Sequence, residues 1–488
     1  MNRQIVKLFG FTVVLFGVLI GFTSYWAVFE AEALKDKEAN KRPLFEQQQI
    51  KRGRILAADG TVLARSVPKG QGDGRRYVRR YPEGELFGHP IGYSFVEQGN
   101  SEFERFHADE LVGEESEFES IFDELRGVRQ EGNDIVTNID TEAQRTALEG
   151  LRSVPGFGAV VAIEPGTGKV KVLASNPPFD PNRVPFELPR LNRNDLEAPL
   201  LDRGTQSRYP PGSTFKVVTA AAALDSGTIT ADTPIDAPGA LEIQGQPLEN
   251  DFGTSYSGLT LDDALTSSVN TWFAQVGERV GQDTLFEYMD RFGFNTTPAI
   301  DIPSEELIVS GLVDLETDSV LDSNDPIDIA RVAIGQERLL ATPLQMAQVA
   351  AAVANRGTLM KPQIWNRVVD PEGRVVDELE PSEFSQPISE ETAAELTTAM
   401  EGVVSSGTGT NAAIPGIAVA GKTGTAETPG NASCGGGVDQ NQAWFIGFAP
   451  ADAPKIAIAA SVECTEQFGG DVAAPIFREV AEAILNGE

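Results

Sequence analysis

The chain has 488 residues, which suits two or three domains with ample core. Its formal net charge of −33 at pH 7 argues against nucleic acid as a partner, because phosphates would be repelled by such a surface. The two cysteines, Cys434 and Cys464, match neither a zinc spacing nor a C-x-x-C redox pair. The two histidines, His89 and His107, lie far upstream of the candidate nucleophile described below, which argues against a Ser-His-Asp triad.

Near the N-terminus, residues 8–29 form an uncharged apolar run. At about 1.5 Å per residue a helix of this length spans roughly 33 Å, enough to cross a bilayer core. Arg3 and Lys7 precede the run and Glu30 follows it, so the positive-inside rule places residues 1–7 in the cytoplasm. We therefore predict a single-pass plasma-membrane protein whose remaining chain is extracytoplasmic. A cleaved signal sequence and a buried core helix are the alternatives.

Residues 30–140 are polar, charged and rich in glycine, with weak periodicity. Phe103, Phe106, Phe118 and Phe122 could form a modest core, since parts of this set have helical spacing. We interpret the segment as a small pedestal domain without chemistry of its own.

The remaining residues, 141–488, alternate between strand and helix patterns. Strands at both ends with helices between them predict one α+β domain, whose sheet joins early and late parts of the chain. A helix is expected from Thr342-Pro343, as N-cap and first-turn proline, to Gly357. The other expected elements are strands at 134–140, 158–163, 169–174, 443–449 and 455–463, and helices at 141–151, 261–265 and 473–485.

The candidate nucleophile lies in the stretch 209–216, YPPGSTFK. Pro-Pro-Gly cannot continue a helix, so Ser213 falls at or next to the N-terminus of the apolar helix that follows. Lys216 lies one turn further on the same face, within reach of the hydroxyl. Half burial by apolar neighbours would lower the pKa of this lysine and let it accept a proton. Serine is also a common N-cap, and Ser66 and Lys69 repeat the spacing in a loop where nothing suggests catalysis.

Two further polar clusters follow. Ser268 and Asn270 lie on a short connection after a probable helix, and could face a cleft or simply cap the next helix. Lys422, Thr423 and Gly424 lie in a strand of small residues that would let a substrate backbone approach, with a cation and a hydroxyl for a carboxylate. The plain alternative is an edge strand with a solvated lysine.

Taken together, S-x-x-K, S-x-N and K-T-G in this order form the signature of penicillin-binding proteins and class A β-lactamases. Over nearly its whole length the chain resembles the class B penicillin-binding proteins, which are peptidoglycan D,D-transpeptidases; its short pedestal and length are most similar to the actinobacterial A-type members. The resemblance implies a serine transpeptidase/β-lactamase-like domain, an antiparallel sheet flanked by helices. Further segments also support the resemblance to this family. They are residues 52–55 and 81–93 in the pedestal, and residues 158–182, 335–336 and 342–346 in the following domain.

The resemblance also implies roles for the catalytic side chains. Ser213 would attack the penultimate D-Ala carbonyl of a stem peptide, with Lys216 as its base. Ser268 and Asn270 would relay a proton and orient the peptide amide. β-Lactams, as mimics of D-Ala-D-Ala, would acylate the same serine, and neither a metal nor a cofactor is needed.

On the substrate side, the resemblance implies that Lys422 and Thr423 hold the terminal carboxylate, along a strand that continues through Gly424. The backbone N–H groups of Ser213 and Thr425 would form the oxyanion hole. The partners it implies are a polytopic glycan polymerase and proteins of cell division or elongation.

Other functions use the same motifs. A class A β-lactamase needs a glutamate for deacylation, but no E-x-x-L-N stands between Asn270 and Lys422. The segment before the catalytic region is too short for a glycosyltransferase domain. A D,D-carboxypeptidase differs only in its acceptor and remains open, as does a non-catalytic β-lactam sensor or divisome scaffold.

The cysteines support a separate prediction. Cys434 follows the K-T-G strand in a glycine-rich connection, and Cys464 ends a later strand. In an antiparallel run of three strands these two points meet at one end of the sheet, and the exterior is oxidising. We predict a disulfide, with two free thiols as the alternative.

Overall fold

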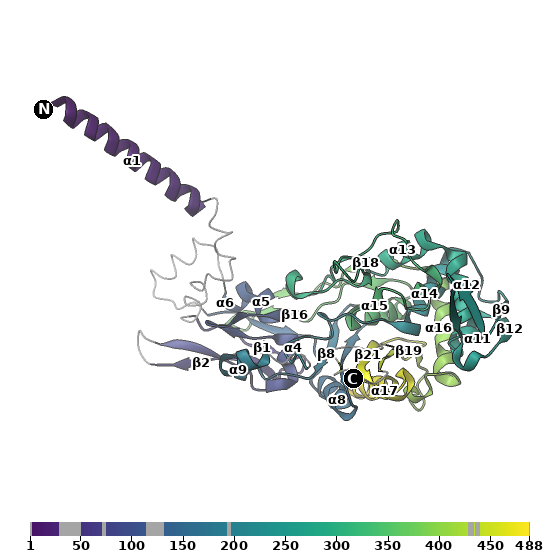
Figure 1. The fold of residues 1–488 in the computed structure, drawn as a ribbon. Helices are drawn as coiled ribbons and strands as arrows, with labels where there is room; N and C mark the ends of the chain where they lie inside the picture. Colours follow the sequence, from purple (N-terminus) through teal and green to yellow (C-terminus); the bar gives the residue numbers. More distant parts are fainter. Residues whose placement is uncertain are drawn as a thin grey trace.

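The computed structural model describes residues 2–28, 50–70, 75–113, 131–192, 197–427, 434 and 440–487. Its first element is helix α1 (Asn2–Val28), which contains the apolar run expected to cross a membrane. The segment from Arg3 to Trp26 is long and apolar enough for a span, and none of it is buried against the rest of the chain. α1 is therefore a candidate membrane anchor (Figure 1).

A six-stranded sheet forms the core of the pedestal, in the order β17-β16-β6-β1-β2-β3. β1 pairs in parallel with β6, and the other neighbours are antiparallel. Two of its strands, β16 and β17, come from the segment 141–488, which we expected to be wholly catalytic. The pedestal sheet therefore includes a hairpin from beyond the predicted domain boundary at 140/141, and that boundary stays a prediction. The strands are β1 (Ile55–Leu56), β2 (Val62–Lys69), β3 (Arg76–Arg80), β6 (Asp134–Thr137), β16 (Trp365–Val369) and β17 (Val375–Glu378).

Of the phenylalanine cluster that the spacing suggested, the described residues show only Phe103 in the buried core of the pedestal. Phe103 is fully buried, but Phe106 is 49% exposed, and residues 118 and 122 lie outside the described part of the chain. A buried carboxylate, Glu104, instead accepts hydrogen bonds from Arg52 Nε (2.8 Å) and Arg79 Nε (2.5 Å). This ionic centre links the first strand segment to β3 and could not be read from apolar spacing.

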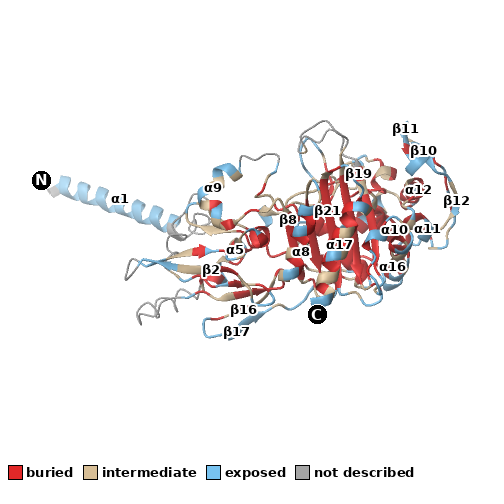
Figure 2. Ribbon diagram, turned by 90° about the horizontal axis from the view of Figure 1, so that it is seen from below, coloured by how far each residue is buried: buried red, intermediate tan, exposed pale blue. Residues whose placement is uncertain are grey.

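The second sheet is antiparallel and has five strands in the order β19-β20-β21-β7-β8. As predicted, it joins early strands to late ones, because β21 pairs with β7. α15 packs on one face, and α8 and α17 pack on the other, which is turned to the viewer in Figure 2. These elements are β7 (Phe157–Ile163), β8 (Val170–Asn176), β19 (Ala420–Glu427), β20 (Asn441–Ala449), β21 (Ile456–Thr465), α8 (Thr141–Ser153), α15 (Pro343–Ala354) and α17 (Gly469–Gly487).

A helical lobe lies beyond β19, around helix α10 (Lys216–Asp225). Every residue of α10 except Asp225 is buried, because α12, α13 and α16 pack around it. The helices of the lobe are α11 (Leu261–Thr266), α12 (Asn270–Val280), α13 (Gln282–Arg291), α14 (Ile329–Val332) and α16 (Glu390–Ser405). Short strand pairs border it: β9 (Ile235–Ala237) with β12 (Tyr256–Leu259), β10 (Ala240–Ile243) with β11 (Gln246–Glu249), β13 (Gly311–Leu312) with β14 (Leu339–Leu340), and β15 (Leu359–Met360) with β18 (Glu383–Ser385).

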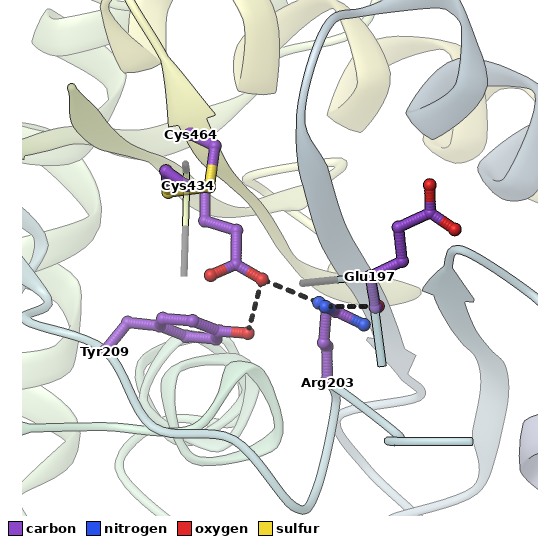
Figure 3. The surroundings of a disulfide bond; sticks show 6 residues. Glu197, Arg203, Tyr209, Cys434 and Cys464 are labelled. Carbon is purple, nitrogen blue, oxygen red and sulfur yellow. Dashed lines mark hydrogen bonds and ion pairs between the residues drawn. A yellow bond between two sulfur atoms is a disulfide. The ribbon is translucent and has the colours of Figure 1, made fainter. Parts of the chain in front are cut away.

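One end of the five-stranded sheet is tied covalently. Cys434 and Cys464 form a disulfide, with their Cα atoms 5.4 Å apart. The adjacent Glu463 accepts hydrogen bonds from Arg203 Nε (2.6 Å) and from the Tyr209 hydroxyl (3.2 Å). Figure 3 shows Arg203 and Tyr209 near the disulfide. The network holds the segment that leads into the candidate nucleophile against β21.

Candidate active site

Ser213 lies in a single 3₁₀ turn, η4 (Gly212–Phe215), that runs directly into α10. The preceding Gly212 adopts φ +52°, a left-handed conformation that glycine tolerates without strain. Thus the serine sits at the entrance of the helix as expected, although α10 itself begins three residues later, at Lys216. No side chain caps the turn, so the hydroxyl of Ser213 is not used as an N-cap.

Two glycines press this turn into place. The N–H of Gly212 donates to the carbonyl of Gly335 (2.9 Å), and a Cβ on Gly335 would lie 1.9 Å from the Gly212 oxygen. On the other side, a Cβ on Gly424 of β19 would lie 2.7 Å from the carbonyl oxygen of Pro211. The turn that carries Ser213 therefore lies in backbone contact with both neighbours, and no side chain can separate them.

Lys216 is fully buried rather than half-buried as its neighbours suggested. Its Nζ donates to Asn270 Oδ1 (2.7 Å), to the Ser268 carbonyl (2.7 Å) and to Ser268 Oγ (3.2 Å). Burial and, next, the charge of Lys422 hold the pKa of Lys216 well below its usual value. Among the described residues no hydrogen bond joins Lys216 to Ser213, so direct contact between these side chains stays a prediction.

Ser268 and Asn270 both point toward the lysines instead of capping a helix. The N-cap position of α12 is Val269, and no side chain caps that helix. Ser268 has φ +55°, which is rare for a residue with a side chain, and its hydroxyl also accepts from Lys422 Nζ (2.9 Å). Backbone strain of this kind occurs where the surrounding structure fixes a functional group. Ser268 Oγ thus lies between the two amines.

Lys422 is not the solvated lysine of a plain edge strand, although β19 is indeed an edge strand of its sheet. Its side chain is fully buried, and burial lowers its pKa to about 7. Thr423 shares a 2.5 Å hydrogen bond with Thr408, and Thr425 Oγ1 accepts from the Gly469 N–H (3.2 Å). The third motif is therefore held in place by contacts on both sides.

The histidines contact groups outside these motifs. His89 Nε2 bonds to the Pro199 carbonyl (3.0 Å), and burial lowers the pKa of this histidine to about 3. His107 Nε2 contacts Asp301 Oδ2 (3.4 Å). Both histidines therefore have partners outside the three motifs, as their positions in the sequence suggested.

The sequence motifs did not reveal three features of the site. Asn270 Nδ2 donates to the carbonyl of Glu249 (2.8 Å), which positions the amide from outside the motif. The charge of Asp251 acts on both lysines and partly offsets the lowering of their pKa values. Gly335 buttresses the serine turn. The Glu249 carbonyl and Gly335 act through backbone atoms, and the side-chain types in a sequence give no signal of such contacts. Gly335 could be noticed only as part of the wider resemblance to the family.

Comparison with known proteins gives the family. The penicillin-binding protein transpeptidase domain matches residues 158–482, and the penicillin-binding protein A dimerisation domain matches residues 52–135. The chain belongs to the class B penicillin-binding proteins. It is thus a peptidoglycan transpeptidase of the serine type, and its fold is the one that the resemblance implied.

Individual relatives support this assignment. The peptidoglycan D,D-transpeptidase PbpA of Mycobacterium tuberculosis is 33% identical over the full length of both chains. Stage V sporulation protein D of Bacillus subtilis is 31% identical over 82% of this chain and 62% of its own. Among solved structures, the ceftriaxone acyl-enzyme complex of M. tuberculosis penicillin-binding protein A has a TM-score of 0.78 at 33% identity, covering 90% of this chain and 99% of that one. A D,D-transpeptidase domain from Eggerthella lenta has a TM-score of 0.77 at the same identity, with the same coverage.

Proposed function

We propose that Ser213 is the acyl-accepting nucleophile and that Lys216 is its base. The observation that carries the proposal is the fully buried Lys216, held by Ser268 and Asn270 one turn from the serine. Since burial lowers the pKa of this amine well below its usual value, its neutral form is more accessible than that of an ordinary lysine and can take the serine proton.

In acylation, Ser213 Oγ attacks the penultimate D-Ala carbonyl carbon while its proton passes to Lys216. The oxyanion is received by the backbone N–H groups of Ser213 and Thr425. These segments are close, because a Cβ on Gly212 would lie 3.0 Å from the Thr425 carbonyl oxygen. Ser268, hydrogen-bonded to Lys216 Nζ, passes a proton to the amine of the departing D-Ala as the C–N bond breaks.

In deacylation, the amine of a neighbouring stem peptide attacks the ester carbon and gives a proton to Lys216, which passes it to Ser213 Oγ as the C–O bond breaks. In the earlier acylation step, before D-Ala leaves, Lys422 and Thr423 bind the terminal carboxylate of the donor, and Asn270 orients the peptide amide. The edge position of β19 leaves room for a donor backbone along Gly424 and Thr425. No step in this sequence requires a metal or a cofactor.

The acceptor distinguishes this function from its rivals. We expect benzylpenicillin to add one penicilloyl mass to the native chain and none to Ser213→Ala. A stem-peptide donor with an amine acceptor should then give a cross-linked product. Hydrolysis alone would indicate a D,D-carboxypeptidase, whereas acylation that stalls without turnover would indicate a sensor or scaffold. A native chain that never gains the adduct would refute the assignment of Ser213.

The location follows from α1 and the disulfide. We propose that α1 anchors the chain in the plasma membrane, with residues 1–7 in the cytoplasm and the catalytic domain outside. Arg3 and Lys7 support this orientation. The Cys434–Cys464 disulfide also supports it, because such bonds persist in oxidising compartments. The proposed partners, beyond stem peptides and β-lactams, are a polytopic glycan polymerase and proteins of division or elongation. Protease accessibility in intact cells would test the orientation.

A further inference from the structure

The β2–β3 hairpin of the pedestal has the opposite charge to the rest of the molecule. Residues 62–80 contain six basic residues and one acidic residue, Asp73, whereas the whole chain has 72 acidic and 39 basic residues. The hairpin extends from the pedestal, away from the five-stranded sheet, in both Figure 1 and Figure 2. A local reversal of charge on a strongly acidic protein points to a ligand of negative charge.

The register of the hairpin places four of these cations on one face. Arg65 lies directly opposite Arg80, and Lys69 lies directly opposite Arg76. All four are exposed, and between the two pairs lies the half-buried pair of Val67 and Val78. We call this surface, formed by Arg65, Lys69, Arg76 and Arg80 around the two valines, the basic face.

The basic face is not balanced by acids of its own chain. Arg79, on the opposite side of the hairpin, is buried and paired with Glu104. By contrast, none of the four cations of the basic face forms an ion pair with any residue that the structure describes. Like charges directly opposite each other destabilise a strand pair. Charge on an edge strand can serve to block aggregation, but acidic residues would serve equally in this acidic chain.

The position of the hairpin in the chain indicates where the negative charge lies. β2 pairs with β1, the first strand after the segment 29–49 that follows α1. Fully extended, that segment reaches at most about 70 Å, so the pedestal stays close to any membrane that α1 spans. Two basic faces would repel each other, so a symmetric contact between the hairpins of two copies is disfavoured. We propose that the basic face binds anionic phospholipid headgroups of the membrane that holds α1, which fixes the orientation of the pedestal.

The physical basis is short-ranged. At physiological salt the Debye length is about 8 Å, so the acidic catalytic domain and the basic face are screened from each other and act locally. Each basic residue near an anionic leaflet strengthens association roughly fivefold. The half-buried valines between the cations suit the headgroup region, where apolar and charged groups are both accommodated.

The experiment uses the full-length chain in lipid nanodiscs, made either from phosphatidylcholine alone or with about a third of phosphatidylglycerol. Trypsin cleavage after Lys69, Arg75 and Arg76 reports access to the hairpin, and cleavage sites in the catalytic domain serve as the internal reference. We expect several-fold slower hairpin cleavage in anionic nanodiscs at about 0.15 M salt, and no difference at about 1 M salt, where screening is nearly complete.

The test variant is Arg65→Gln with Arg80→Gln, which removes two cations and keeps all three cleavage sites. The association constant of the hairpin with the anionic leaflet should fall by roughly 25-fold, and protection from trypsin should fall with it. The melting temperature should be unchanged, because neither residue forms an ion pair within the described part of the chain. The matched control, Arg279→Gln with Arg478→Gln, removes two cations of the catalytic domain and should keep full protection. Equal cleavage in both lipids would overturn the proposal. So would protection that appears only when a partner protein or cell-wall polymer is added.

Discussion

Replacing Gly335 by alanine should disable the site without contact with substrate. Gly335 lies directly behind the turn that carries Ser213, and its own φ is +78°. A Cβ there would lie 1.9 Å from the oxygen of the Gly212 carbonyl group, whose carbon is bonded to the Ser213 nitrogen. Because the same two glycines also share a 2.9 Å hydrogen bond, neither backbone can move alone.

The size of the effect follows from these distances. Ordinary contacts of a Cβ begin at 3.4 Å, so the Gly212 carbonyl must retreat by about 1.5 Å from a Cβ at 1.9 Å. A misplacement of about 1 Å at a reacting group can lower a rate by about 100-fold. The left-handed conformation itself adds about 1 kcal/mol of strain for alanine. We therefore expect acylation at least 100-fold slower, with a modest loss of stability.

The assay is the second-order rate of acylation by a fluorescent penicillin, beside the melting temperature. Gly227→Ala is the matched control. Gly227 follows the C-terminus of α10 with φ +72°, and no atom lies within 4 Å of its added Cβ. That variant carries the same conformational strain without the clash, so it should acylate normally. A folded Gly335→Ala protein that acylates at the native rate would show that the turn tolerates the displacement and that the reasoning is wrong.

Three further outcomes are expected. Removal of the disulfide by Cys434→Ser with Cys464→Ser should lower the free energy of unfolding by about 3–4 kcal/mol, given a sequence separation of 30 residues, as chemical denaturation would show. Since the pKa of Lys422 is about 7, its positive charge is lost above that pH. The KM of a donor with a free carboxylate should therefore rise by up to about tenfold per pH unit above pH 7. A C-terminally amidated donor should show no such rise. Burial opposes the charge of His107, but its contacts with the carboxylates of Asp301 (3.4 Å) and Glu110 (3.7 Å) outweigh it and raise its pKa to about 9. Its folded-state pKa thus exceeds the unfolded value of 6.5, so the protonated histidine stabilises the fold by about 3 kcal/mol. This stabilisation is complete below pH 6.5 and is lost as the pH rises through 9. The difference in unfolding free energy between the native chain and His107→Gln should shrink over that window.

Much of the fold could be predicted, because periodicity and turn residues are local signals. The helix from Pro343, capped by Thr342, and strands β20 and β21 lie where the sequence placed them. The hairpin of β16 and β17 was missed as part of the pedestal, since it joins strands more than 200 residues earlier in the chain. No local pattern reports such a pairing. Buried ionic centres such as Glu104 escape detection for the same reason.

The candidate site was predictable where side chains carry the chemistry and not where backbone geometry does. Lys216, Ser268 and Lys422 were found by type and spacing, and the structure brings them together. The complete burial of Lys216 and Lys422 was not foreseen, because it depends on packing against elements far along the chain, such as the helices that enclose α10. Gly335 and the Glu249 carbonyl act through main-chain atoms.

A single hydroxyl, that of Ser268, lies between the two buried lysines. Ser268 Oγ is 3.2 Å from Lys216 Nζ and 2.9 Å from Lys422 Nζ, and both amines are fully buried. Two buried ammonium groups around one hydroxyl would repel each other, so the pair favours a single positive charge. The charge of Lys422 lowers the pKa of Lys216, which makes Lys216 the first to lose its proton. The site thus favours a neutral amine at Lys216 and a cation at Lys422 on β19, which is the arrangement that the proposed acylation and carboxylate binding require.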